Sequence, residues 1–382
     1  MSIRKKLREI FPAGYRDLEK RYRDLEQQNK KLYQELQKQV PKEIEACVKR
    51  ELERREDWEK RKLETAYLAK GRLVWLIKCP APDHERKAKW GDYIYALSLK
   101  KYLERLGIYV EIDLREDWNR EADADVVLVL RGLHFYRPDR RNGKCVYIMW
   151  NISHPEMVTK EEYQLYDVVC IGSRHYAKKL KQEIDIPVVA MQQCTDTELF
   201  CPEGEKDAPC LDQWLFVGNS RGVMRSAVKY SIEEKLPLYM VGGNWKTVMP
   251  EHMDMVREPF IQNDDLPRYY RAAKVTLNDH WEDMLEYQFV NNRIFDALAC
   301  GLPVVTDHCE EISEIFSKGV LYYRNQEEFR QCVKKVEESY EELAQGAKEQ
   351  RALICEKYSF EARAKELVEI ADHIKRTSDR RL

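Results

Sequence analysis

The chain contains 382 residues, with 65 lysines and arginines against 67 aspartates and glutamates, and a formal net charge of −2. This length suits two domains of ordinary size with additional segments. The near-neutral charge argues against a dedicated nucleic-acid-binding protein, which is normally basic. The sequence has neither the ~18 apolar residues of a transmembrane helix nor, after its basic start, the apolar stretch that would predict a secretory signal.

Eleven cysteines are scattered through the chain, and no two of them form a Cys-x-x-Cys pair. Cys79, Cys145 and Cys170 fall in apolar runs, where a free cysteine behaves as a small hydrophobic residue. This distribution favours reduced, buried thiols over disulfides or a zinc site, and it therefore predicts a cytoplasmic protein.

Residues 1–70 differ in composition from the rest of the chain. Apolar residues recur at alternating spacings of three and four between Tyr15 and Leu36, with Asn29 at one a position of this heptad pattern. A lone asparagine at an a position favours a defined register. The pattern predicts a coiled coil through which the protein forms a homo-oligomer. A helical hairpin within one chain is the alternative, because Pro41 separates this helix from a second charged one. The basic, amphipathic start is also suited to contact an anionic membrane surface.

From Gly71 onward, short apolar strands alternate with amphipathic helices, which is typical of α/β domains with parallel sheets. A polar, proline-containing stretch divides the strands into two sets. The fold class is therefore predicted to be α/β, with two Rossmann-like domains preceded by the helical region. The expected segments are the helical region 1–70, a first domain 71–195, a linker 196–210, a second domain 211–355 and a C-terminal helix 356–382.

Nine buried strands are expected in the two domains before the segment described next. They are 73–77, 109–113, 125–130, 145–150, 167–172, 188–191, 214–218, 238–242 and 274–278.

The stretch 291–307 is the most informative segment of the chain. It begins with Asn291, Asn292 and Arg293, continues as an amphipathic helix, stops at Gly301 and restarts as an apolar strand. The free backbone N–H groups at a helix start, together with two amides and an arginine, predict an anion site. A glycine stop followed by a Val-Val strand occurs in any doubly wound sheet, so the polar start is the informative part.

No Gly-x-Gly-x-x-Gly follows the first strand, which argues against a nicotinamide dehydrogenase. The sequence also lacks a Gly-x-x-x-x-Gly-Lys-Ser/Thr motif, which argues against a P-loop nucleotidase. Four segments instead resemble, in the expected order, GT-B-fold glycosyltransferases of the group 1 type. Short stretches near 277–284 and 292–296 resemble the branch typified by spore-maturation glycosyltransferases. The four segments are 195–202, 216–225, 264–278 and 291–307.

The resemblance implies a nucleotide-diphosphate sugar as donor substrate, bound by the second domain, without a metal or other cofactor. It places Asp296 at the ribose hydroxyls, where a carboxylate can accept two hydrogen bonds. Gln288 stands where many relatives have a glutamate that holds the sugar. Backbone amides at Asn291 and Asn292 would face the diphosphate, and Arg293 would add a cation able to make paired bonds to phosphate. The alternative for Asp296 is an exposed helix carboxylate, and the alternative for Arg293 is a salt bridge to a neighbouring carboxylate.

A second group of candidates follows the first strand of the donor domain. Arg221 and Arg225 lie just beyond a turn formed by Gly218 and Asn219, at the carboxyl end of the strand. There they would neutralise the departing pyrophosphate, as protein cations do where a metal ion is not used. Solvated surface arginines are the alternative.

Two further pairs complete the predicted donor site. Gly243 and Asn244 follow the next strand and are expected to line the base pocket. His280 and Asp283 belong to a polar cluster suited to recognise sugar hydroxyls. They could share one helix face, yet no second histidine lies nearby in the sequence, so a metal site is not expected.

The first domain would bind the acceptor. Relatives often place a histidine against the donor sugar after a buried strand, and His154 occupies such a position. Asp92 lies in the loop where relatives have a glycine-rich turn near the acceptor. A general base would need to reach the acceptor hydroxyl, and an enzyme that retains configuration needs none.

The sequence thus predicts a metal-independent glycosyltransferase that moves a sugar from a nucleotide-diphosphate sugar to a glycan or lipid-linked acceptor. Surface polysaccharide biosynthesis in bacteria is the context that the resemblance implies, in the cytoplasm or at the inner face of the membrane. No nucleic-acid partner is expected. The alternatives are a nucleotide-sugar 2-epimerase of the same fold and a non-catalytic coiled-coil scaffold with a degenerate glycosyltransferase fold.

Overall fold

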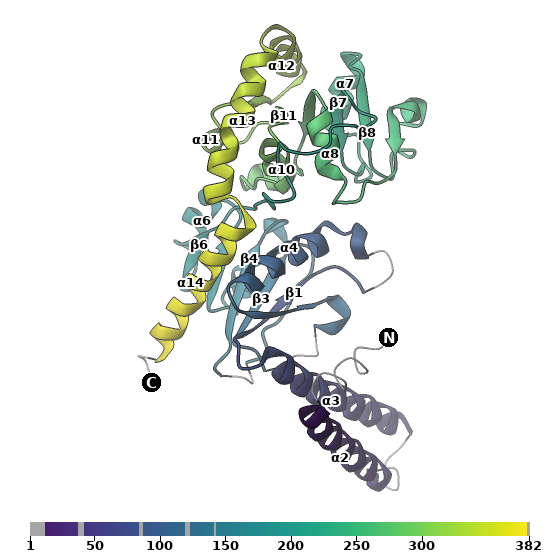
Figure 1. Ribbon diagram of the computed structural model, residues 1–382, viewed down its shortest axis with the longest axis vertical. Coiled ribbons are helices and arrows are strands. Elements are labelled where there is room, and N and C mark those ends of the chain that lie inside the picture. Colours follow the sequence, from purple (N-terminus) through teal and green to yellow (C-terminus); the bar gives the residue numbers. More distant parts are fainter. Residues whose placement is uncertain (1–11, 37–41, 84–86, 119–122, 141–142, 380–382) are drawn as a thin grey trace.

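The computed structural model describes residues 12–36, 42–83, 87–118, 123–140 and 143–379. At the N-terminal end, helix α2 (Pro12–Leu36) lies beside helix α3 (Lys42–Ala69) (Figure 1). The Lys60 ammonium lies 4.9 Å from the centroid of the Tyr22 ring on the facing helix. Within one chain the two helices therefore form the helical hairpin that the sequence analysis gave as the alternative. A coiled coil between two chains stays a prediction. The basic start of the chain lies outside the described residues.

Helix α3 is attached to the first domain by polar contacts. The Thr65 hydroxyl donates a hydrogen bond of 2.6 Å to a carboxylate oxygen of Glu111. Arg61 forms ion pairs with Glu111 and with the buried Asp113. These contacts fix the base of the hairpin against the edge of the first sheet.

The first domain is built on a six-stranded parallel sheet with the order β2-β1-β3-β4-β5-β6. Its central strands are buried on both faces, as the continuous apolar runs predict. Its strands are β1 (Val74–Lys78), β2 (Tyr109–Asp113), β3 (Val126–Arg131), β4 (Val146–Asn151), β5 (Val168–Ile171) and β6 (Val188–Ala190). The helices are α4 (Gly91–Arg105), α5 (Lys160–Tyr163) and α6 (Arg174–Leu180), with the 3-10 turns η1 (Lys87–Lys89), η2 (Arg115–Asp117) and η3 (Pro155–Met157).

The second domain repeats this architecture with the strand order β12-β11-β10-β7-β8-β9, again all parallel. The strands are β7 (Trp214–Val217), β8 (Leu238–Val241), β9 (Val256–Glu258), β10 (Val275–Asn278), β11 (Val304–Asp307) and β12 (Val320–Tyr323). The helices are α7 (Ser226–Glu233), α8 (Leu266–Ala272), α9 (Glu282–Glu286), α10 (Asn292–Ala299), α11 (Glu310–Ile315), α12 (Gln326–Glu338) and α13 (Tyr340–Lys357), with the 3-10 turn η4 (Pro250–Met255). The sequence analysis missed the edge strands β9 and β12.

The C-terminal helix α14 (Phe360–Asp379) leaves the second domain and packs on the first, against α4 (Figure 1). The Phe360 ring lies 4.6 Å from the Tyr95 ring, centroid to centroid. The Lys375 ammonium reaches Asp125 at 3.1 Å. The end of the chain therefore ties the two domains together.

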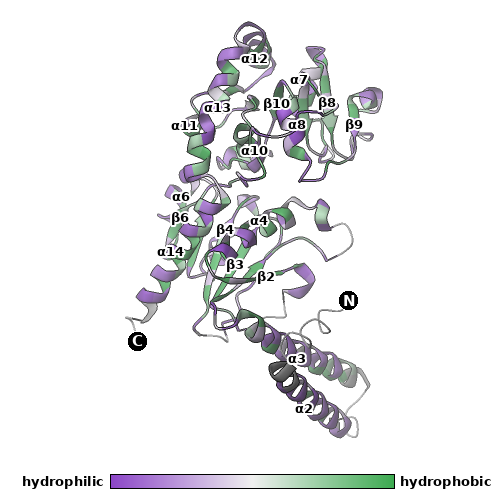
Figure 2. Cartoon of the chain, viewed as in Figure 1, coloured by the Kyte–Doolittle hydropathy of each residue, from purple (hydrophilic) through white to green (hydrophobic). Residues whose placement is uncertain are grey.

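Hydrophobic residues concentrate in the two sheets and on the inner faces of the surrounding helices, whereas α2 and α3 are largely hydrophilic (Figure 2). Each sheet has a separate apolar layer on either face. Among the described residues, no helix combines the length and the apolar character needed to span a membrane.

Candidate functional site

The carboxyl edge of the second sheet carries most of the predicted donor-site residues. At this edge, Gly242 and Gly218 pack so closely that a methyl group on Gly242 would lie 2.1 Å from the Gly218 carbonyl oxygen. Gly242 also has a φ of +144°, which favours glycine. The Asn219 side chain accepts a hydrogen bond of 2.7 Å from the Gly243 N–H. The turns after β7 and β8 therefore hold each other in place, with Asn244 following in a left-handed conformation.

Arg225, at the start of α7, is only 4% exposed. Its guanidinium lies 4.6 Å from the Phe216 ring centroid, donates to the Asn219 carbonyl oxygen at 3.1 Å and forms an ion pair with Asp279. Its Nε has no hydrogen-bond partner. Burial, followed by the charges of Arg293 and Arg221, lowers the pKa of Arg225 to about 7. The alternative of a solvated surface arginine is therefore wrong for this residue.

Arg221 and Arg293 extend the positive charge beside Arg225. The Arg221 guanidinium lies 4.3 Å from the centroid of the Trp281 ring, and burial and then Arg293 lower its pKa to about 9. The Arg293 Nε donates to the side-chain oxygen of Asn278 at 3.4 Å, and burial lowers the pKa of this guanidinium too. Three guanidinium groups that repel one another thus gather where β7 and β10 end, which makes the region receptive to an anion.

His280 and Asn291 organise the start of α10 next to this cluster. His280 Nδ1 lies 2.6 Å from a carboxylate oxygen of Asp307, and its Nε2 accepts a hydrogen bond of 3.3 Å from the Asn291 N–H. Both ring nitrogens of His280 therefore have partners within the second domain, and the imidazole supports the start of α10. The buried side-chain oxygen of Asn291 has no partner.

Asp296 is 4% exposed, so it is not an exposed helix carboxylate. Its two carboxylate oxygens accept hydrogen bonds from the Thr195 hydroxyl at 2.5 Å and from the Asn292 amide at 3.0 Å. Burial raises its pKa to about 7. Asp296 and Asn292 line a pocket of about 140 Å³ between the domains. Trp90 and Gly91 of the first domain and Phe260 and Asn263 of the second also line this pocket.

The Gln288 side-chain amide is bonded at both ends to the protein backbone. Its amide nitrogen donates to the Leu285 carbonyl oxygen at 3.2 Å, and its amide oxygen accepts from the Glu311 N–H at 3.2 Å. The fully buried Glu311 in turn accepts bonds from Arg174 of the first domain. The sequence analysis missed this contact between domains.

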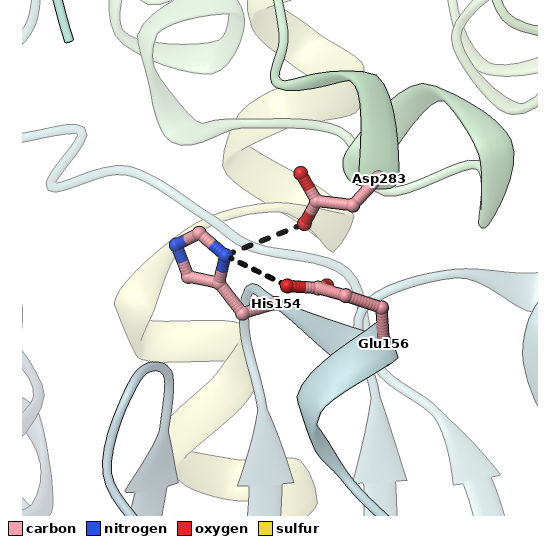
Figure 3. A group of neighbouring side chains, drawn as sticks. All are labelled: His154, Glu156 and Asp283. Atoms are coloured by element: carbon pink, nitrogen blue, oxygen red, sulfur yellow. Dashed lines mark hydrogen bonds and ion pairs between the residues drawn. The ribbon is translucent and has the colours of Figure 1, made fainter. Parts of the chain in front are cut away.

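His154 lies after β4, at the side of the first domain that faces the second (Figure 3). Its Nδ1 is 3.3 Å from a carboxylate oxygen of Glu156 and 3.4 Å from one of Asp283, which belongs to α9 of the other domain. Asp92 is close enough for its charge to interact with His154: burial raises the pKa of Asp92, and the histidine lowers it. The structure thus brings Asp92, His154 and Asp283 together, and it adds Glu156, which the sequence analysis missed.

Comparison with known proteins finds a family match in the second domain and a shared fold over most of the chain. Residues 223–369 match a family described as glycosyl transferase-like. No curated protein sequence matches the chain. A sucrose-phosphate synthase from Thermosynechococcus elongatus has a TM-score of 0.59 at 12% identity, over 79% of this chain and 99% of that one.

Two other solved structures share the same arrangement. An α,α-trehalose 6-phosphate synthase from Burkholderia multivorans has a TM-score of 0.56 at 8% identity, over 80% of this chain and 99% of that one. The Anabaena protein HepE, solved in complex with UDP-glucose, has a TM-score of 0.52 at 12% identity, over 81% of this chain and 100% of that one. The predicted fold class is confirmed for the two parallel α/β domains. The chain has the GT-B fold, and residues 223–369 carry a glycosyl transferase-like domain.

Proposed function

We propose that the protein transfers a sugar from a nucleotide-diphosphate sugar to a glycan or lipid-linked acceptor without using a metal ion for the transfer. The observation that carries this proposal is the convergence of Arg221, Arg225 and Arg293 at the carboxyl edge of the second sheet. Burial lowers the pKa of all three guanidinium groups, and Arg293 lowers the pKa values of Arg221 and Arg225 further. A diphosphate would supply the missing negative charge, and it gains charge as the sugar departs.

The start of α10 would add a second contribution to diphosphate binding. The side chain of the N-cap residue Asn291 does not cap the backbone N–H groups of the first turn, and the helix dipole favours negative charge there. The Asn292 N–H is already bonded to the side chain of Gln193 at 2.8 Å, so the remaining N–H groups of the turn would make the contact.

The neighbouring pocket is suited to the nucleoside. Asp296 offers a carboxylate that can accept hydrogen bonds from a ribose diol, and the exposed Trp90 and the Phe260 side chain supply apolar surface for a base. The complex of Anabaena HepE with UDP-glucose supports a uridine diphosphate sugar as the first donor to test.

The wider context is also a proposal. The fold and the segment resemblance support a role in bacterial surface polysaccharide biosynthesis, within the spore-maturation-like branch, at the cytoplasmic side of the membrane. The helical hairpin of α2 and α3 exposes the apolar side chains of Leu32 and Ile44, which supports association of two chains as a homo-oligomer.

A thermal-shift screen of nucleotide sugars tests the donor proposal directly. A donor at a hundred times its dissociation constant should add ~2.7 kcal/mol to the free energy of unfolding. Product formation should persist in excess EDTA, because the arginines neutralise the diphosphate. Activity that is lost in EDTA and restored by metal would overturn the metal-free mechanism. Incubating the donor alone separates transfer from epimerisation, which needs no acceptor.

A further inference from the structure

Three potential metal ligands meet at the junction of the two domains. His154 follows β4, Glu156 belongs to the 3-10 turn η3, and Asp283 belongs to the first turn of α9. One ligand atom from each residue lies within 4.8 Å of the other two. Figure 3 shows both carboxylates facing the same imidazole nitrogen, Glu156 from the first domain and Asp283 from the second. The three groups therefore form a compact set of one nitrogen and two oxygen donors.

The cluster has one imidazole for two carboxylates. Both carboxylates lie near the same imidazole nitrogen, which can donate only one hydrogen bond. The Asp283 oxygen that faces His154 is inaccessible to solvent and has no hydrogen-bond partner of acceptable geometry. Arg221 interacts with Asp283 only through space, because its guanidinium rests on the Trp281 ring. A buried carboxylate oxygen without a donor is the arrangement that a bound cation would relieve.

The backbone at His154 supports a specific role for this side chain. His154 has a φ of 51° and a ψ of 52°, a left-handed conformation that is costly for a residue other than glycine. Pro155 follows it directly and begins the turn that carries Glu156. The left-handed backbone at His154 and the turn that follows it therefore direct the His154 and Glu156 side chains toward the second domain.

We propose that a divalent transition-metal ion of the Mn²⁺ or Zn²⁺ class binds to His154, Glu156 and Asp283. An imidazole combined with two carboxylates suits such ions, whereas Ca²⁺ and Mg²⁺ favour oxygen ligands. Three protein ligands leave positions for water. Since the ligands come from both domains, the bound ion restrains the domains from separating.

A bound ion is expected to slow sugar transfer, and this expectation, unlike the metal site itself, rests on the proposed function. The arginine cluster, not this ion, neutralises the diphosphate. An ion that holds the domains together slows the opening that releases product. Added metal is therefore expected to inhibit transfer, and a chelator is expected to restore it.

Binding of the metal alone tests the site. The full-length protein is stripped with EDTA, desalted and titrated with Mn²⁺ while free Mn²⁺ is measured by electron paramagnetic resonance. Mn²⁺ is preferred to Zn²⁺ as the first probe because the exposed thiols of Cys47 and Cys355 can bind zinc. We expect one Mn²⁺ per chain. Asp283→Asn and His154→Ala should weaken binding by about tenfold or more.

His175→Ala is the matched control. His175 also faces the second domain, with its Nε2 3.2 Å from Glu314, but it is not part of the three-ligand cluster. Its removal should leave Mn²⁺ affinity unchanged. Each variant is first shown to unfold cooperatively, and Mn²⁺ should raise the melting temperature of the wild type but not of Asp283→Asn. Absence of a saturable site, or equal affinity in wild type and Asp283→Asn, would overturn the proposal whether or not the protein transfers sugar.

Discussion

Glu311 of the second domain accepts hydrogen bonds from both the backbone N–H and the side-chain Nε of Arg174 in the first domain, at 3.0 Å and 2.9 Å. The Gln192 amide donates to the same carboxylate. Glu311 is fully buried and lies in the first turn of the helix that follows β11. The contact therefore joins the two domains through one carboxylate that has no access to water.

Replacement of Glu311 by alanine is expected to destabilise the protein by about 1–3 kcal/mol, because buried donors that faced the carboxylate lose their partner. Denaturant unfolding measures the change. Glu314→Ala is the control, since Glu314 contacts Arg174 at 3.1 Å but has a side chain that is 50% exposed. An exposed pair of this kind contributes less than about 1 kcal/mol. Equal losses in the two variants would show that Glu311 is not the anchor between the domains.

Arg293→Ala is expected to lower the rate of sugar transfer by about 10²–10³-fold, the usual effect of removing one group that stabilises developing charge. The melting temperature should stay the same or rise, because the substitution removes a charge that opposes Arg221 and Arg225. Steady-state kinetics and thermal unfolding measure the two effects. Arg330→Ala, at a side chain that is 52% exposed, is the control and should leave transfer intact. Retained turnover in Arg293→Ala would rule out its proposed role.

Gly242→Ala is expected to destabilise the second domain by about 2 kcal/mol or more, because the new methyl group meets backbone and the residue has a positive φ. The nearest atom would be the Gly218 carbonyl oxygen at 2.1 Å. Gly243→Ala is the adjacent control, since its nearest atom would be the Asn219 side-chain oxygen at 3.5 Å. A urea titration of both variants checks the difference. Similar stability in the two variants would contradict the close packing of the two turns.

Asp296 is expected to make stability depend on pH. Burial raises its pKa in the folded protein to about 7, above the value of 3.8 for an unperturbed aspartate. Between these values the folded protein holds a proton that the unfolded chain has released. The contribution of Asp296 to stability is therefore largest at low pH and falls as pH rises toward 7, by at most about 1.4 kcal/mol per pH unit.

Urea unfolding of the wild type and of Asp296→Asn at several pH values between 4 and 8 isolates this contribution. The amide does not titrate, so the difference in unfolding free energy between the two proteins should change with pH in the direction given above. Parallel profiles for the two proteins would mean that the carboxyl of Asp296 titrates near its ordinary pKa.

The α/β class and the division into two sheets followed from the sequence, because buried parallel strands leave continuous apolar runs that alternate with helices. The helix start at Ser173 and the stop at Gly301 were also readable, since caps are local: the Ser173 hydroxyl accepts the Tyr176 N–H at 3.0 Å, and Gly301 has a φ of +77°. The edge strands β9 and β12 escaped notice because three or four residues, partly exposed, carry too little pattern.

The sequence by itself placed Arg221, Arg225 and Arg293 at one edge of the second sheet, because residues that follow parallel strands meet at their carboxyl ends. Only the tertiary structure decided which partners the other polar residues take. His280 contacts Asp307, and the Gln288 side chain accepts a hydrogen bond from the Glu311 backbone. Asp283 contacts His154 across the junction of the two domains. These contacts join residues far apart in the chain, and the packing of one domain on the other, not any local pattern, determines them.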